Sequence, residues 1–269
     1  MLMALPKENT SKNGIYLPTR CIVGNTYKSL EVRGLTIGEL LTLSKVSDNK
    51  AISDLDTNTI RDLLSKIFKV EDNYTIRDVY MVDIKFGLLY SLIITDSKYS
   101  FEYNITCSEF KDTDADGNEV VKGCGHKFSH KITPRDYIID TGKVVGEAEI
   151  EGYKLAPITF GDWIDSIDMI QNNDSVYDKL RIVFASLLNM PGKTLKDKLK
   201  EIDENVPARV ALEIQNNEYI QKMDIQPEFI EVECPECGEV RRFIPDFDIK
   251  ALLPSLWTRG YIAYNIFTC

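Results

Sequence analysis

The sequence has few of the residues and motifs that enzymes use for catalysis. Its 269 residues include two histidines, His126 and His130, so an imidazole-activated nucleophile would have to use one of these two. It contains no Gly-x-Gly-x-x-Gly or Gly-x-x-x-x-Gly-Lys-Ser/Thr phosphate loop, no Gly-x-Ser-x-Gly elbow and no His-Glu-x-x-His motif. We therefore expect a non-enzymatic protein without a small-molecule substrate.

Long hydrophobic runs are also missing. The longest candidate, residues 79–95, contains Asp83 and Lys85 and falls short of the roughly 18 uninterrupted apolar residues expected of a membrane span. The first nine residues lack the basic start and apolar core of a signal peptide. We expect no membrane partner and a reducing cytoplasm, where disulfide frameworks are rare. Cys21 and Cys269 are then plain thiols.

The sequence contains fewer basic than acidic residues. Lys and Arg number 32 against 42 Asp and Glu, which gives a formal net charge of -10. A general nucleic-acid binder needs a basic surface to displace counterions from phosphates, so a nucleic-acid partner is not expected. With 43% hydrophobic residues, the chain has enough apolar side chains for a sizeable core in one or two domains.

Four of the six cysteines occur in two segments that we call knuckles. The second knuckle contains Cys234 and Cys237, whose Cys-x-x-Cys spacing is usual for zinc ligands. In the first knuckle, residues 108–123 are inserted between Cys107 and Cys124.

The residues that flank the two knuckles are similar. Alternating, strand-like runs precede them at residues 101–106 and 229–233. A glycine and then an aromatic residue follow them, within residues 125–128 and 238–243. The glycine allows backbone amides to turn toward the sulfur atoms without a Cβ in the way. The parallel predicts one site assembled from two halves.

Four thiolates satisfy a tetrahedral zinc ion and leave no open position for catalysis. We predict a structural Zn²⁺ bound by Cys107, Cys124, Cys234 and Cys237. The alternatives are ordinary reduced cysteines and a redox disulfide in the Cys-x-x-Cys pair, although a thioredoxin-type motif opens a helix and this pair lies between strand-like runs. His126 is a possible substitute for Cys124, but we expect it at the rim of the site.

The insertion in the first knuckle contains a second metal-like pattern. Residues 112–117 have the acidic spacing that opens a calcium loop, but the twelfth position, which needs a bidentate glutamate, is Gly123. The Asp-Gly-Asn sequence favours a solvated hairpin turn instead.

The fold expected from these patterns is α+β and mainly helical, with a split four-cysteine, zinc-ribbon-like β-element that joins an N-terminal helical part to a helical insertion. Capping residues predict helices that begin near Thr36, Asn58, Thr75, Thr159, Asp174 or Ser175, Thr194 and Pro207. The expected parts are a flexible N-terminus (1–13), a β/helical part (14–100), the first half of the zinc element (101–152), the helical insertion (153–226), and the second knuckle with a C-terminal helix and tail (227–269).

The order of these parts resembles the T-even phage baseplate hub and assembly protein family of contractile-tailed bacteriophages. The resemblance rests on residues 16–20 (YLPTR), on residues 32–40 (VRGLTIGEL) and on the segment 83–92, which leads into a strand and a knuckle. It implies a non-enzymatic subunit of the central hub or inner baseplate. Its partners would be other hub or tail proteins, and its location the virion after assembly in the host cytoplasm. The cysteines are the only site that we transfer.

Two other functions remain open at this point. A zinc-ribbon regulator that binds RNA polymerase or nucleic acid would need a basic face, for which residues 127–131 and 241–242 offer little material. A thiol redox protein would use Cys234 as a reactive thiolate in the metal-free state.

Overall fold

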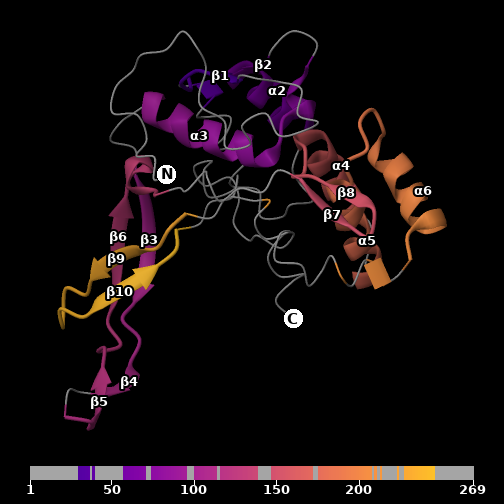
Figure 1. Ribbon diagram of the computed structural model, residues 1–269. Helices are drawn as coiled ribbons and strands as arrows, with labels where there is room; N and C mark the ends of the chain where they lie inside the picture. Colours follow the sequence, from indigo (N-terminus) through magenta and orange to yellow (C-terminus); the bar gives the residue numbers. More distant parts are fainter. Residues whose placement is uncertain are drawn as a thin grey trace.

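The described part of the chain forms helices and small two-stranded antiparallel sheets, a mixed α/β structure (Figure 1). The computed structural model describes residues 30–36, 38–39, 57–70, 74–95, 100–113, 116–138, 147–171, 175–207, 209–210, 213, 223 and 227–245. The segments expected at 15–20 and 249–257, the tail from 261, Cys21, Cys269 and most of the helices expected from Thr36 and Pro207 lie outside these residues.

The N-terminal part of the body pairs two short strands beside a helix. β1 (Leu30–Val32) is antiparallel to β2 (Phe68–Val70), which directly follows α2 (Thr57–Ile67). The apolar residues of α2 lie on one face and are buried, as the helical spacing predicts. Helix α2 begins at Thr57, one residue before the cap expected at Asn58.

The buried centre of the body is α3 (Met81–Thr95), whose described side chains are buried on nearly all sides. The predicted single helix from Thr75 is wrong in one respect. Residues Ile76–Asp78 form a 3₁₀ turn, and Val79 is extended. This break arises because Phe160 N–H donates to the Val79 carbonyl at 2.8 Å and Met81 N–H donates to that of Ile158 at 2.8 Å. Tertiary pairing therefore overrides the helical pattern.

The second part of the body is a hairpin followed by three helices. β7 (Ala148–Ile150) pairs with β8 (Tyr153–Leu155), so the expected helical insertion starts with a strand. The helices are α4 (Phe160–Gln171), α5 (Val176–Leu187) and α6 (Leu195–Asn205). Their first turns are capped by the predicted Thr159, Ser175 and Thr194.

Helix α5 ends at Leu187 because Leu188 leaves the helix and bridges to Leu155 of β8. A nearly buried ion pair joins α6 to α4. Lys198 Nζ lies 2.7 Å from the Asp162 carboxylate, and both side chains are almost inaccessible to solvent. The helices and the hairpin thus form one packed unit.

Three two-stranded sheets form an arm that projects from the body, with β4 and β5 at its outer end (Figure 1). We define the arm as residues 101–132 and 230–243. Its strands are β3 (Phe101–Thr106), β4 (Phe110–Thr113), β5 (Glu119–Lys122), β6 (Lys127–Ile132), β9 (Ile230–Glu233) and β10 (Val240–Phe243).

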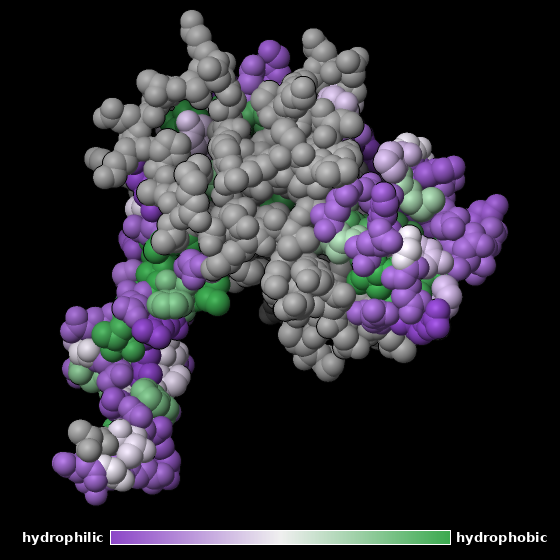
Figure 2. Space-filling model, in the orientation of Figure 1, coloured by the Kyte–Doolittle hydropathy of each residue, from purple (hydrophilic) through white to green (hydrophobic). Residues whose placement is uncertain are grey.

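In the arm β3 pairs with β6, β4 with β5 and β9 with β10. Residues 112–113 end β4 and residues 116–117 precede β5, in agreement with the hairpin prediction. A 3₁₀ turn, Pro134–Asp136, follows β6. The arm surface is mostly hydrophilic with small apolar patches (Figure 2). Among the described residues, no helix is long and apolar enough to cross a membrane.

Candidate metal centre

Strand pairing brings the two cysteines of the first knuckle together. The β3–β6 ladder ends at the pair Thr106 and Lys127, so the chain leaves β3 at Cys107 and returns through Cys124. Cys107 N–H donates to the His126 carbonyl at 2.8 Å, and Gly125 N–H donates to the Cys107 carbonyl at 2.8 Å. The inserted β4–β5 hairpin is thereby set outside the knuckle.

The second knuckle repeats this backbone arrangement at the tip of the β9–β10 hairpin. Cys234 N–H donates to the Glu239 carbonyl at 2.9 Å, and Gly238 N–H donates to the Cys234 carbonyl at 2.9 Å. Gly125 and Gly238 have nearly the same positive φ, 72° and 73°, which glycine adopts without steric cost. The similarity expected from the flanking residues is present in the backbone.

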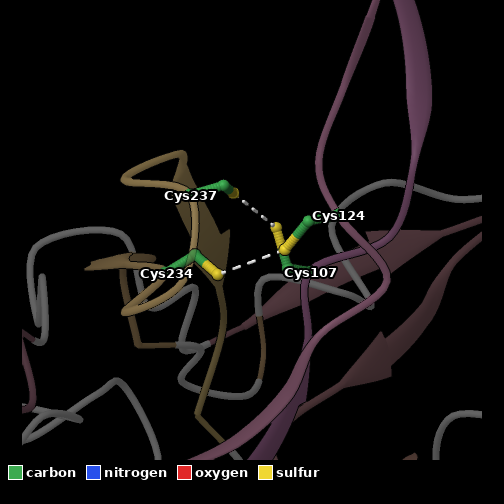
Figure 3. Close-up of side chains that lie close together, drawn as sticks. All are labelled: Cys107, Cys124, Cys234 and Cys237. Carbon is green, nitrogen blue, oxygen red and sulfur yellow. Dashed lines mark hydrogen bonds between the residues drawn. The ribbon is translucent and has the colours of Figure 1, made fainter.

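The four sulfur atoms of the two knuckles point toward one another (Figure 3). Their Sγ atoms all lie within 4.8 Å of one another. The contacts across the knuckles are 3.6 Å for Cys107 to Cys237 and 3.7 Å for Cys124 to Cys234. Metal–sulfur bonds of about 2.3 Å in a tetrahedron place sulfurs about 3.8 Å apart. The structure therefore brings together all four predicted ligands with spacings that suit a tetrahedral metal.

The arrangement is also that of free thiols, because both contacts exceed the roughly 2.05 Å of a disulfide bond. Tetrahedral sulfur sites suit zinc or iron. In each knuckle the first cysteine, Cys107 or Cys234, is buried, and the second, Cys124 or Cys237, is exposed. A bound ion would have one protein-facing side and one solvent-facing side.

Arg241 of β10 reaches across to the first knuckle. Its Nε and Nη2 donate to Cys107 Sγ at 3.4 and 3.3 Å, and Nη2 also donates to the Ser108 carbonyl at 2.6 Å. Burial raises the pKa of the Cys107 thiol, but the hydrogen bonds from Arg241 and from the neighbouring knuckle groups outweigh this and bring the pKa to about 7. Cys107 therefore loses its proton more readily than an ordinary cysteine.

The opposite shift occurs at the exposed cysteine of the same knuckle. The backbone at His126 lowers the pKa of Cys124, but burial and the three neighbouring thiols raise it to about 12. The pKa values of Cys107 and Cys124 are thus shifted in opposite directions, and a metal ion that binds the sulfur atoms as thiolates must displace their protons.

Gly123 leaves the space that Arg241 occupies. A Cβ on Gly123 would lie 2.3 Å from Arg241 Nη2 and 2.3 Å from the Ser108 carbonyl oxygen, and its φ is +90°. Sequence reasoning missed both residues. The available signal was the alternation along β10, which places Arg241 on the same face as Phe243.

The histidines contact aromatic rings. The ring of His126 stacks on Phe128 with centroids 6.1 Å apart, and the group of four close ligands contains cysteines alone. His130 is half-buried, and its ring lies edge-on to that of Phe243 with the ring centroids 6.4 Å apart. Its packing follows from β9–β10 lying against β3–β6 at Tyr103 and Phe243.

Comparison with known proteins adds no relative to this description. No family model, curated protein or solved structure matches the chain.

Proposed function

We propose that the chain is a non-enzymatic structural or assembly subunit whose four clustered cysteines hold a structural Zn²⁺. The assembly we propose is the baseplate hub of a contractile phage tail, where its partners would be hub or tail proteins of the virion. The first part rests on the metal centre, and the second on the resemblance of residues 16–20, 32–40 and 83–92 to that family.

One observation carries the zinc proposal: four thiols from two sequence-distant knuckles lie within 4.8 Å of one another, and the two contacts between the knuckles, 3.6 and 3.7 Å, are close to the tetrahedral value. Four thiolates complete the zinc shell, so the ion has no vacant position for a substrate. A metal at this point would join the β9–β10 hairpin to β3–β6 and so close the chain from residue 125 to residue 233. The zinc-ribbon-like description of the arm is part of this proposal.

A structural ion suits an arm made of two-stranded sheets, because an isolated hairpin is at best marginally stable in water. Structural zinc sites have apparent binding energies of about 10–16 kcal/mol in peptides. Closing a long loop costs roughly 5 kcal/mol of chain entropy. The metal would therefore stabilise the arm where buried side chains are scarce.

The regulator alternative has less support in the contacts of its two arginines. Arg241 is engaged with Cys107 and Ser108, and Arg242 donates to Glu231 at 2.8 Å. Both cations are thus occupied by groups of the chain itself. This weakens the case for binding to nucleic-acid phosphates.

Metal content tests the zinc proposal. We expect one zinc per chain by elemental mass analysis of the purified protein, and loss of that zinc in Cys107→Ser and Cys234→Ser. Cys269→Ser, which alters a cysteine outside the group of four, should keep it. Stoichiometric iron would overturn the choice of metal. A wild-type protein without metal, carrying a disulfide between Cys234 and Cys237, would favour the thiol redox function instead.

Co-assembly tests the baseplate proposal. We expect the tagged chain to co-sediment with baseplate or tail intermediates from cells that assemble contractile tails, identified by mass spectrometry of the gradient fractions. A zinc-loaded chain that sediments alone in such extracts, and appears in neither intermediates nor finished particles, would overturn the assignment while leaving the metal centre intact.

A further inference from the structure

We propose that Arg241 is the positioning residue of the metal centre. Its guanidinium joins the Cys107 sulfur to the base of the β4–β5 hairpin and so makes the direction of this hairpin depend on the bound metal. The inference rests on the proposed zinc site and adds to it a residue that is no ligand.

Three contacts of one side chain carry this inference. The guanidinium donates to Cys107 Sγ and to the Ser108 carbonyl, and its Cζ lies 4.8 Å from the centroid of the Phe110 ring. These three residues form the path from the first knuckle into β4. Arg241 itself belongs to β10 of the other knuckle. One side chain thus connects both knuckles to the hairpin.

The hairpin needs such a connection because its sheet provides none. Among the described strands, β4 and β5 pair with each other and with no third strand. Residues 107–109 leave the β3–β6 sheet, and residues 123–126 return to it. The direction of the hairpin therefore depends on contacts at its base, where Arg241 lies.

The segment that follows β5 leaves space for the guanidinium. Gly123 stands where any Cβ would meet both Arg241 Nη2 and the Ser108 carbonyl oxygen at 2.3 Å. At that distance an added side-chain carbon and the arginine cannot both be accommodated without a shift. Gly123 and Arg241 therefore form a matched pair.

The charge of Arg241 suits a metal–thiolate cluster. Zn²⁺ with four thiolates carries a net charge of about -2, and hydrogen bonds from a cation to a thiolate are stronger than those between neutral groups. Groups that hydrogen-bond metal ligands orient them, and their loss typically costs about 10- to 100-fold in metal affinity. Arg241 satisfies this role through two N–H donors on one sulfur.

The neighbouring Arg242 provides a matched control. It stacks on an aromatic ring, with Cζ 4.7 Å from the Phe229 centroid, and donates Nε to Glu231 at 2.8 Å. It therefore has the same kinds of contact as Arg241, an anion and a ring, without contacting a cysteine.

The experiment compares full-length Arg241→Gln and Arg242→Gln with the wild type, each loaded with Zn²⁺ or Co²⁺. We expect Arg241→Gln to lower zinc affinity about 10- to 100-fold in competition with a chromophoric chelator. It should also shift the sulfur-to-cobalt charge-transfer bands and raise amide exchange across residues 108–122. Arg242→Gln should change none of these. The cobalt spectrum is decisive because a merely structural role in the hairpin would leave it unmoved.

A second pair of variants tests the same Arg241 contact by substitution of the glycine that lies against it. Gly123→Ala should reproduce the effects of Arg241→Gln because the methyl group displaces the guanidinium. Gly117→Ala is its control, since φ is +86° there and no atom lies within 4 Å of an added Cβ. Both alanines thus impose similar backbone strain.

Two results would overturn the inference. If the wild type binds one zinc and Arg241→Gln matches Arg242→Gln in affinity, spectrum and exchange, Arg241 has no positioning role and the zinc proposal stands. If the wild type binds neither zinc nor cobalt, the metal centre and the inference fail together.

Discussion

The arm and the helical body are stabilised in different ways. Helix α3 in the body buries Ile84, Leu89 and most of its other side chains in the main hydrophobic core. Among the described residues of the arm, the buried residues are few, and they are Cys107, Ile132, Val232 and Cys234. Half of this set consists of proposed metal ligands.

The difference shows where each part obtains its stability. Burial of apolar surface contributes about 25 cal/mol per Å², which can hold the body together through α3. The arm has its apolar packing near its base, where Tyr103, Ile230 and Phe243 contact the main core. Farther from the body, the four cysteines lie where an apolar core would otherwise hold the strands of the arm together. The stability of the outer arm should therefore follow the metal and that of the body should not.

The largest effect is expected from removal of the metal. Removing a zinc ion from a structural site of this kind removes on the order of 10 kcal/mol of apparent binding energy. After chelation, amide hydrogen exchange should rise sharply in residues 101–132 and 230–243, while α3 keeps its protection. Adding Zn²⁺ back should restore the arm. Equal loss of protection in α3 and the arm would contradict this separation of the two parts.

A cavity in the body should have a smaller effect, and it should destabilise the body while the metal site in the arm stays intact. Leu89 is fully buried, and Leu→Ala at such positions typically costs about 2–5 kcal/mol. Leu89→Ala should lower the free energy of unfolding of the body by that amount and leave the zinc content at one per chain. Val121→Ala replaces a residue of the arm that is 64% exposed. It should change the free energy of unfolding by less than about 0.5 kcal/mol. Loss of zinc in Leu89→Ala would show that the two parts depend on each other.

The same comparison explains how much the sequence could predict. Local signals sufficed where neighbouring residues decide the structure. The caps at Thr159, Ser175 and Thr194, the hairpin turn at Gly117 and the burial of α3 all follow from such patterns. The four-cysteine cluster was predictable because both knuckles carry the same glycine and strand-like flanks.

Contacts between distant segments could not be predicted in this way. The break before α3 depends on backbone hydrogen bonds to residues 158 and 160, and the early end of α5 depends on the bridge from Leu188 to Leu155. Arg241 and Gly123 meet through pairing of the two knuckles. A sequence pattern shows periodicity and local turns, so it does not specify which distant segments come into contact.

The smallest effect is expected from acid titration at the edge of the body. Thr36 and Glu39 form the predicted capping box, since Thr36 N–H donates to the Glu39 carboxylate at 2.8 Å and Glu39 N–H donates to the Thr36 hydroxyl at 3.3 Å. Arg33 donates to both carboxylate oxygens, at 2.9 and 2.6 Å. Hydrogen bonds from Arg33 lower the pKa of Glu39 from 4.5 to about 2.

Because the folded-state pKa is lowered, this carboxylate contributes stability above pH 4.5, and the contribution is lost as the pH falls toward 2. Arg33 is 43% exposed, so solvent limits the contribution to less than about 1 kcal/mol. Glu39→Gln should lower the urea midpoint at pH 6 and approach the wild type at pH 3. Zinc release in acid affects both proteins alike, so the difference between their pH curves isolates Glu39. Parallel curves from pH 6 to pH 3 would show that the Arg33–Glu39 pair adds nothing to the stability of the body.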